Sequence, residues 1–244
     1  MPQSRIYQPV SLSVDSELEL DEAASHHLAR VLRIQQGEMI RLFNGEGGEY
    51  TAKVVAIGKR KVTAHIQEFY DHNVESPLQL CLAQGISRGE KMDYTIQKAV
   101  ELGVSHIFPL LTERCNVKLD DERKQKRTAH WQSIIQSACE QSGRNRIPTL
   151  AEPQTLTQWL HSTQPDYGFI LAPKAPQKLH EFKVPATAKI TLLIGPEGGL
   201  SDQEINQAVE KKFIPLSLGP RILRTETAAV AALTALQCFF GDLS

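Results

Sequence analysis

The sequence lacks the features that mark secreted, metal-binding or membrane proteins. Its four cysteines are widely spaced, with no C-x-x-C pair and no histidine at zinc spacing. A disulfide framework or a structural zinc site is therefore not expected, and no metal is predicted. The N-terminus MPQSRIYQPV lacks a basic and then apolar secretion signal, and no apolar run reaches the length of a membrane span. We expect a cytoplasmic protein with reduced thiols and no membrane partner.

An excess of charge of one sign is also absent. The 27 Lys and Arg residues oppose 28 Asp and Glu residues, which gives a net charge of −1. No global field therefore draws this chain onto a nucleic acid or a membrane. Lys and Arg outnumber the acids within residues 86–146 but not within residues 1–72. A polyanionic partner would be held by a local patch, and weak binding to naked RNA is expected.

The first part of the chain is predicted to be a small β-rich module. Strand-like segments occupy residues 38–43, 49–58 and 61–70, and glycine-containing turns separate them. A small barrel is the natural way to close so few short strands. The polar segment 71–77 (DHNVESP) is predicted to be a linker.

One helix is predicted within this module. Residues 21–33 (DEAASHHLARVLR) place Ala24, Leu28, Val31 and Leu32 at helical spacing. This spacing is typical of an amphipathic helix. His26 and His27 within it are interpreted as packing and capping residues and not as metal ligands.

Strands and helices alternate after the linker. Strands are expected near 78–83, 106–110, 167–172, 189–194 and 213–219. Helices are expected at 89–102, 120–142, 155–161, after Ser201, and at 227–240. This alternation predicts an α/β domain built on a mostly parallel sheet. The predicted domains are therefore residues 1–72 and residues 73–244.

Residues 189–240 contain two consecutive strand–glycine loop–helix units. The first loop is GPEGG at 195–199, and the second follows the strand at 213–219. In a parallel sheet such loops converge on one crevice, where ligands bind. Neither loop is G-x-x-x-x-G-K-[ST] or G-x-G-x-x-G, so a phosphate cradle is not indicated. The pattern favours a small molecule enclosed by backbone and apolar walls.

Several motifs together closely resemble the RsmE family of ribosomal RNA methyltransferases, within the SPOUT superfamily. They are HHLARVLR, SRGEKMDYTIQKAVELGV, ERCNVKL, ACEQSGRNRIP, IGPEGGLSDQEI and LGPRILRTETAAVAAL. The resemblance covers essentially the whole chain. It implies an N-terminal PUA-like β-barrel domain and a C-terminal α/β domain with a trefoil-knotted, mostly parallel sheet flanked by helices.

The resemblance also implies an activity. It implies a homodimer that uses S-adenosylmethionine to methylate N3 of a uridine in 16S ribosomal RNA, U1498 in the family's usual numbering. An assembled 30S subunit is the expected form of this substrate. Mapping the family's cofactor loops onto this sequence gives a set of cofactor-binding residues. They are Leu171, Ala172, Pro173, Gly195, Pro196, Gly198, Gly199, Leu216, Leu218, Gly219, Arg221 and Leu223.

Three charged residues are candidates for the chemistry. A cation near the uracil carbonyls would stabilise the anion formed when the N3 proton leaves. Arg224 is the first candidate and Arg88 the second, with phosphate contact or a salt bridge as alternatives. Glu197 faces the sulfonium, orients its loop, or does neither. Which group accepts the N3 proton stays open.

Basic residues outside these loops are candidates for RNA contact. They are Arg5, Arg30, Arg33, Lys91, Arg144 and Arg146. The cluster RKQKR at 123–127 has three acids beside it and is interpreted as a solvated helix face. Three alternative functions stay open: 2′-O-methylation of ribose, an RNA-binding assembly factor without turnover, and a small-molecule dehydrogenase.

Overall fold

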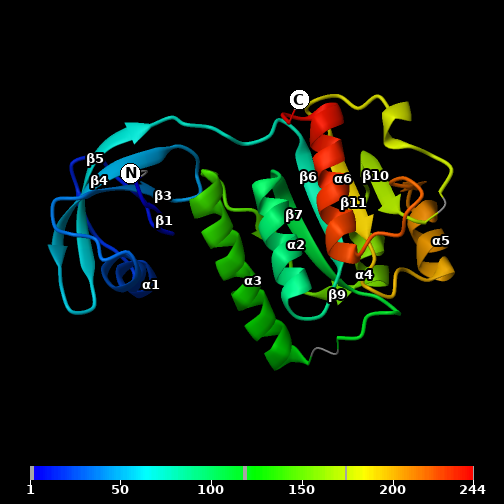
Figure 1. The fold of residues 1–244 in the computed structure, drawn as a ribbon, viewed down its shortest axis with the longest axis horizontal. Coiled ribbons are helices and arrows are strands. Elements are labelled where there is room, and N and C mark those ends of the chain that lie inside the picture. Colours follow the sequence, from blue (N-terminus) through cyan, green and yellow to red (C-terminus); the bar gives the residue numbers. More distant parts are fainter. Residues whose placement is uncertain (1–2, 118–119, 174, 244) are drawn as a thin grey trace. The chain divides into compact units, whose positions relative to one another are not determined.

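Each of two parts of the chain is built around its own β-sheet in a computed structural model that describes residues 3–117, 120–173 and 175–243. The first unit consists of the chain up to Glu75 together with Cys139–Ile147. The second consists of Ser76–Ala138 and the chain from Pro148 onward. Figure 1 shows the elements of both units in sequence colours.

The first unit contains a five-stranded sheet in the order β1-β3-β4-β5-β2. Its strands are β1 (Arg5–Tyr7), β2 (Glu17–Glu19), β3 (Met39–Phe43), β4 (Glu49–Ile57) and β5 (Val62–Tyr70). The β1–β3 pair is parallel and the other pairs are antiparallel. Alternate residues such as Val54 and Ala64 are fully buried in its core. The prediction of a β-rich module with strands near 38–43, 49–58 and 61–70 is confirmed.

The predicted helix at 21–33 is confirmed only in part. It is an α-helix over α1 (Glu22–His26), continued by a π-helical turn, η1 (His27–Val31), in which Leu32 N–H donates to the His27 carbonyl at 2.9 Å. The wider turn rotates the following residues relative to α-helical spacing. Leu28 is fully buried, whereas Val31 is 59% and Leu32 45% exposed. The four apolar residues at helical spacing therefore do not form one buried face, because the last two are exposed.

The second unit contains a parallel sheet in the order β12-β10-β11-β6-β7-β8, and β9 also pairs with β7. Every described pair in this sheet is parallel. Its strands are β6 (Gln79–Gly85), β7 (Val104–Leu111), β8 (Thr149–Leu150), β9 (Gln154–Thr155), β10 (Tyr167–Leu171), β11 (Lys189–Ile194) and β12 (Phe213–Leu216). The predicted mostly parallel α/β fold is confirmed.

Helices cover both faces of this sheet. They are α2 (Glu90–Glu101), α3 (Asp121–Ser142), α4 (Leu156–Ser162), α5 (Asp202–Glu210), α6 (Thr225–Phe240) and the short 3-10 helix η2 (Leu179–Glu181). On one face, Ile170 and Leu193 pack in a core with Trp159 of α4 and Ala208 of α5. Since strand side chains alternate, the neighbouring residue Phe169 faces α6 on the other side. In Figure 1, α2 and α6 lie side by side over the strands, and they contact each other.

The long helix α3 contributes to both units. Trp131 and Ile135 on its predicted apolar face are fully buried. Its last residues, from Cys139, belong to the first unit. Gly143 follows its end with φ +85, the left-handed conformation expected of a residue that terminates a helix. Among the described helices, none combines the length and the apolar character needed to cross a membrane.

Candidate cofactor and RNA site

Three loops leave the sheet of the second unit at the same edge. The strands β12, β10 and β11 are parallel neighbours, so the loops after their carboxyl ends start side by side. Leu171 and Leu216, the last residues of β10 and β12, stand in register. Ala172 N–H donates to the Leu216 carbonyl at 3.0 Å, which continues this pairing into the loops. The predicted cofactor loops at 171–173, 195–199 and 216–223 therefore meet at one edge.

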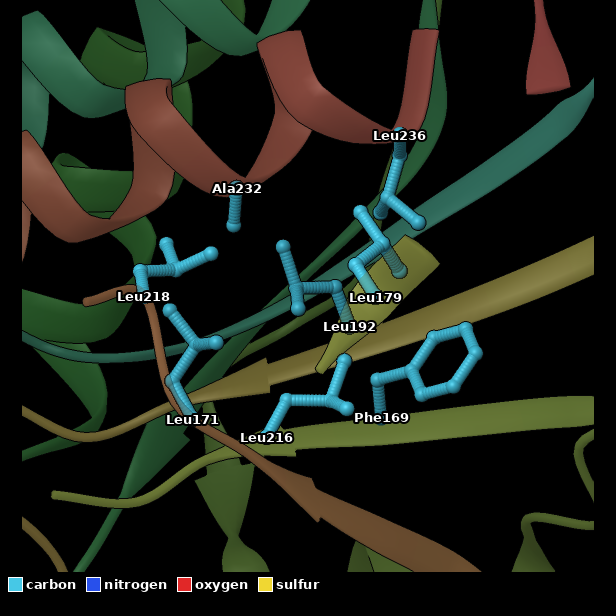
Figure 2. A pocket seen from close by; sticks show the side chains of 8 residues that line it. All are labelled: Phe169, Leu171, Leu179, Leu192, Leu216, Leu218, Ala232 and Leu236. Carbon is cyan, nitrogen blue, oxygen red and sulfur yellow. The ribbon is translucent and has the colours of Figure 1, made fainter. Parts of the chain in front are cut away.

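An apolar cavity lies beneath these loops (Figure 2). Figure 2 shows Ala232 and Leu236 of α6 directed toward leucines of the strands and loops. The lining residues are Phe169, Leu171, Leu179, Leu192, Leu216, Leu218, Ala232 and Leu236. Its volume of about 10 Å³ is close to the room one water molecule needs. Three of the predicted cofactor residues, Leu171, Leu216 and Leu218, thus share one apolar wall.

The GPEGG loop is a tight turn that has no room for side chains at two of its glycines. A Cβ on Gly195 would lie 2.9 Å from the Gly199 carbonyl carbon and from Leu200 N. A Cβ on Gly198 would lie 2.9 Å from the Cβ of Arg114. Gly199 has φ +69, a conformation that side chains disfavour. Pro196 is buried, and the loop is followed by the predicted helix α5.

Two residues that support this loop were not singled out from the sequence. A Cβ on Gly85, at the end of β6, would lie 2.5 Å from Pro196 N and Cδ. Arg114 Nη1 donates to the carbonyls of Gly198 at 3.3 Å and Leu200 at 3.2 Å. Gly85 follows an apolar strand, which is the same signal that identified Gly195. Arg114 lies in the ERCNVKL motif, whose last two residues, 118–119, lie outside the described residues.

Glu197 connects the GPEGG loop to the SRGEK segment. Its Oε1 accepts the Arg88 backbone N–H at 3.1 Å and lies 3.4 Å from Lys91 Nζ. Burial by itself would raise the pKa of the Glu197 carboxyl. The hydrogen bonds from its own backbone, from Arg88 N–H and from Lys91 outweigh burial and lower the pKa. Of the alternatives considered for Glu197, this placement favours orientation of its loop.

The two candidate arginines are both exposed at this edge. Arg224 immediately precedes α6 in the N-cap position, and its side chain makes no capping hydrogen bond. Within the described part of the chain, no carboxylate forms an ion pair with Arg224. Arg88 Nη2 lies 3.5 Å from the Asn116 carbonyl, a long contact that leaves its guanidinium otherwise available. Lys91, which is predicted to contact RNA, forms an ion pair with Glu197.

The remaining residues of the third loop differ in exposure. Gly219 and Arg221 are exposed, Leu223 is half-buried, and Ile222 is 88% exposed. Gly219 has φ +73. In the first loop, Ala172 is half-buried and Pro173 is exposed. This loop edge therefore presents both backbone and side chains to solvent above the apolar cavity.

Two of the predicted RNA-binding arginines are held by carboxylates inside the first unit. Arg5 forms an ion pair with Glu49 and donates to Asn145 Oδ1 at 2.7 Å. The Arg144 side chain is only 5% exposed and donates to Glu75 Oε2, with Nε at 2.9 Å. Both placements favour a structural role for these guanidinium groups.

The other predicted RNA-binding arginines of the first unit are exposed. Arg30 and Arg33 flank the exposed Val31 and Leu32, and Arg33 has φ +54. Arg146 donates its backbone N–H to Glu75 Oε1 at 3.2 Å, while its side chain lies near Gly47. Among the predicted RNA-binding residues of the first unit, these three arginines are the exposed ones. No group of three or more His, Cys, Asp or Glu residues able to hold a metal occurs in the described ranges.

Comparison with known families defines the class to which this fold and site belong. Residues 74–237 match the family model of an RNA methyltransferase domain, and residues 20–67 match that of an RNA methyltransferase PUA domain. The first match covers the parallel sheet and all three loops. The chain is thus an RNA methyltransferase in class.

Full-length relatives give the particular family. Ribosomal RNA small subunit methyltransferase E of Buchnera aphidicola (subsp. Schizaphis graminum) is 38% identical over 241 residues and covers 98% of both chains. The same enzyme from Neisseria gonorrhoeae, solved bound to S-adenosyl methionine, is 40% identical with a TM-score of 0.92. A putative methyltransferase of Legionella pneumophila, solved with bound SAM, is 45% identical with a TM-score of 0.97. Both structures cover 100% of this chain and 100% of their own. This chain belongs to the ribosomal RNA small subunit methyltransferase E (RsmE) family.

Proposed function

We propose that this protein transfers a methyl group from S-adenosylmethionine to N3 of a uridine in 16S ribosomal RNA, the nucleotide U1498 in the family's usual numbering. The convergence of three loops over an apolar cavity is the observation that supports this most directly. Relatives that are 40% and 45% identical over the whole chain were solved with this cofactor bound.

The residues at the loop edge fit the proposed cofactor. Leu171, Leu216 and Leu218 form an apolar wall suited to a neutral adenine ring. The cavity has room for about one water molecule and is far smaller than such a ring, so a bound ring either displaces these side chains or lies outside the cavity. The glycines of the 195–199 loop let its backbone approach a ligand closely. The remaining proposed contacts are Ala172, Pro173, Pro196, Gly219, Arg221 and Leu223.

The bound cofactor would supply an electrophilic methyl group, and the protein's task is chiefly orientation. N3 lies on the Watson–Crick edge of uracil, so the base must be unpaired or extruded before it can react. Holding the reacting atoms in line can replace several kcal/mol of barrier. The exposed guanidinium of Arg224 is proposed to stabilise the charge that develops on the uracil carbonyls. Arg88 is proposed to assist it or to hold a neighbouring phosphate.

Glu197 is proposed to orient these groups and not to accept the proton. Its carboxylate is already bonded to Arg88 N–H and Lys91, and its pKa is lowered. A carboxylate with a lowered pKa is a weak base. It instead fixes the segment that presents Arg88 next to the GPEGG loop.

The knot and the dimer are also proposals. Gln177, in the segment between β10 and β11, forms an isolated parallel bridge with Leu216, the last residue of β12, and Ser217 Oγ donates to the Ala175 carbonyl at 3.0 Å. These contacts hold the loop after β12 against the loop after β10, and this proximity is consistent with the proposed knot. The small and apolar residues of α6 are consistent with a homodimer. Light scattering would test the dimer, and a monomer at micromolar concentration would contradict it.

We propose that the substrate is the assembled 30S subunit, in the cytoplasm. The net charge of −1 supplies little general attraction for RNA, so the assembled 30S particle is a better target than naked RNA. Residues 1–72 are proposed as the RNA-binding domain and residues 73–244 as the methyltransferase domain. Arg30, Arg33 and Arg146 are the proposed RNA contacts that the first unit exposes.

The decisive experiment is mass spectrometry of 16S RNA from cells that lack this protein. Loss of N3-methyluridine, restored by the wild-type gene, is expected. Persistence of this nucleoside would refute the proposed substrate. Calorimetry with S-adenosylmethionine and with NAD provides the second test, because binding of NAD alone would favour a dehydrogenase.

Arg224→Ala is the companion experiment at the site. Cofactor affinity is expected to stay within about threefold, while kcat falls by about 100-fold, as for other lost transition-state contacts. An equal loss of affinity and turnover would make Arg224 a structural residue.

A further inference from the structure

Gln84 is a fully buried polar residue at the end of β6 that has no assigned role. Its Nε2 donates to Thr225 Oγ1 at 2.9 Å and to the Gly85 carbonyl at 3.0 Å. The Gly195 carbonyl lies 3.4 Å from the same nitrogen. The two carbonyls can only accept, so these contacts fix which end of the amide is the nitrogen.

Thr225 completes a chain of hydrogen bonds. Its Oγ1 donates to the Gly195 carbonyl at 2.7 Å, so it must accept from Gln84. Thr225 is 6% exposed and is the first residue of α6. Gly195 is the first residue of the GPEGG loop. Gln84, Thr225 and Gly195 therefore form one buried, hydrogen-bonded junction between β6, α6 and the proposed cofactor loop.

This junction is close in sequence to all three candidate catalytic residues. Arg224 directly precedes Thr225, Glu197 follows Gly195 by two residues, and Arg88 follows Gln84 by four. Backbone packing reinforces the junction, since a Cβ on Gly85 would overlap Pro196. The Arg224 side chain does not cap α6, so Thr225 anchors the start of this helix.

The Gln84 amide is costly to bury. Its Oε1 is inaccessible and has no hydrogen-bond partner in the described part of the chain. An unsatisfied buried oxygen destabilises a fold, and an apolar side chain of similar shape would avoid this cost. A stability role alone does not explain glutamine here, whereas alignment of the loops does.

We propose that Gln84 and Thr225 are positioning residues that hold the Arg224 end of α6 at a fixed distance from the cofactor loop. This inference rests on the proposed methyl transfer. Cofactor contacts are made by the loops themselves, so affinity for the cofactor does not require the junction. Alignment of Arg224 with the reacting base does require it.

Thr225→Val tests the proposal because it keeps the shape of the side chain and removes the hydroxyl. Misplacement by about 1 Å can cost about 100-fold in rate, so kcat should fall by about that factor. The Kd for S-adenosylmethionine should stay within about threefold. Thr225→Ser should restore most of the turnover, and Gln84→Met should reproduce the Thr225→Val defect. Thr227→Val, an exposed position of the same helix, is the matched control and should retain wild-type kcat.

Hydrogen exchange provides a readout that does not depend on turnover. In the wild-type protein, addition of S-adenosylmethionine should increase amide protection at residues 225–229, and Thr225→Val should abolish this response while the loop at 195–199 remains protected. Unchanged kcat and unchanged protection in Thr225→Val and Gln84→Met would refute the inference. Equal losses of kcat and cofactor affinity, without rescue by Thr225→Ser, would also refute it. A wild-type protein that binds the cofactor but methylates no small-subunit RNA would instead refute the proposed function.

Discussion

Glu197 shows how a single carboxylate can join two segments that lie far apart in the sequence. Its partners Arg88 and Lys91 stabilise the ionised form, so the folded protein releases the proton at a lower pH than the unfolded chain. The interactions of the Glu197 carboxylate with Arg88 N–H and Lys91 are therefore fully formed above the ordinary glutamate pKa of about 4.3. Its contribution to stability is lost as the pH falls through the lower pKa of the folded state.

Glu197→Gln tests this linkage at the residue scale. The amide can still accept from Arg88 N–H, but it loses the ion pair with Lys91. We expect the melting temperature of wild-type protein to exceed that of Glu197→Gln at neutral pH. The difference should shrink as the pH falls below the ordinary glutamate pKa of about 4.3 and vanish below the lower pKa of the folded state. A difference in melting temperature that does not depend on pH would contradict this role. Asp202→Asn, an exposed position in the first turn of α5, is the control.

Gly85→Ala tests the contact between β6 and the proposed cofactor loop. The new methyl group would lie 2.5 Å from Pro196, so the loop must move. We expect affinity for S-adenosylmethionine to fall by more than tenfold, measured by calorimetry. Gly37→Ala is the control, because Gly37 has φ +95 and open space around it. That change should destabilise the first unit by about 1 kcal/mol through backbone strain and leave cofactor affinity unchanged. Equal affinities in the two variants would refute the importance of this contact.

At the scale of elements, the start of α5 is secured by a capping box. Glu204 N–H donates to Ser201 Oγ at 3.2 Å, and Glu204 Oε2 accepts from Ser201 N–H at 2.8 Å. The other carboxylate oxygen of Glu204 accepts Glu113 N–H at 2.9 Å. The helix behind the GPEGG loop is thereby joined to the segment that contains Arg114.

Variants of this box should differ in a defined order. Ser201→Ala should cost about 1 kcal/mol, the usual value of an N-cap. Glu204→Ala should cost about 2–3 kcal/mol, because it also leaves Glu113 N–H without its charged acceptor. Glu210→Ala, exposed in the last turn of α5, should have little effect. Thermal unfolding measures all three, and 1 kcal/mol corresponds to about 2–4 °C for a protein of this size. Equal costs for Ser201→Ala and Glu204→Ala would show that the Glu113 bond contributes nothing.

The elements that were predictable from the sequence have strong local signals. The strand at 189–194 (KITLLI) is mostly apolar, and Ser201 with Glu204 has the spacing of a capping box. The short strands β1, β2, β8 and β9 were not predicted. Two or three residues are too few to show a periodicity, and such strands depend on partners that are distant in the sequence. The π-helical turn at His27–Val31 was not predicted because its residues have ordinary helical spacing.

For the candidate site, the sequence predicted the loops but not the contacts that support them. Glycines after apolar strands indicated the loop at 195–199 and the loop after the strand at 213–219, and the family resemblance added the segment 171–173. The structure brings these three loops to one edge of the sheet. The supporting contacts of Gln84, Gly85 and Arg114 were not predictable, because each depends on which strands become neighbours. The sequence also gave no sign that Arg5 pairs with the buried carboxylate of Glu49, or Arg144 with the half-buried carboxylate of Glu75. Local chemistry identifies a charge, but only the fold identifies its partner.

At the scale of the whole molecule, the two units share the chain in an interleaved order. The segment Cys139–Ile147 belongs with the N-terminal strands although the second unit precedes and follows it. Glu75 fixes this segment by accepting from the Arg144 side chain and from Arg146 N–H. His72 contributes its carbonyl as an acceptor for Asn145 Nδ2 at 2.8 Å.

Glu75→Ala should therefore loosen the first unit as a whole. Removing one partner of a buried ion pair typically costs about 3 kcal/mol or more. We expect faster hydrogen exchange in residues 139–147 and in β1, with the sheet of the second unit unaffected. Glu152→Ala, in the chain of the second unit, serves as a control. Normal protection of residues 139–147 in Glu75→Ala would show that other contacts hold this segment.

The interleaved order has a consequence for synthesis on the ribosome. The strands of the first unit emerge early, but Asn145, which bonds Arg5, and Glu140, whose Oε1 accepts Tyr7 N–H at 3.0 Å, are translated much later. At elongation rates of about 5–20 residues per second, the gap from Glu75 to Ile147 lasts about 4–14 s. During that interval the nascent N-terminal strands lack part of their native contacts. The first unit, although first in sequence, completes its folding only after the chain has passed through the beginning of the second.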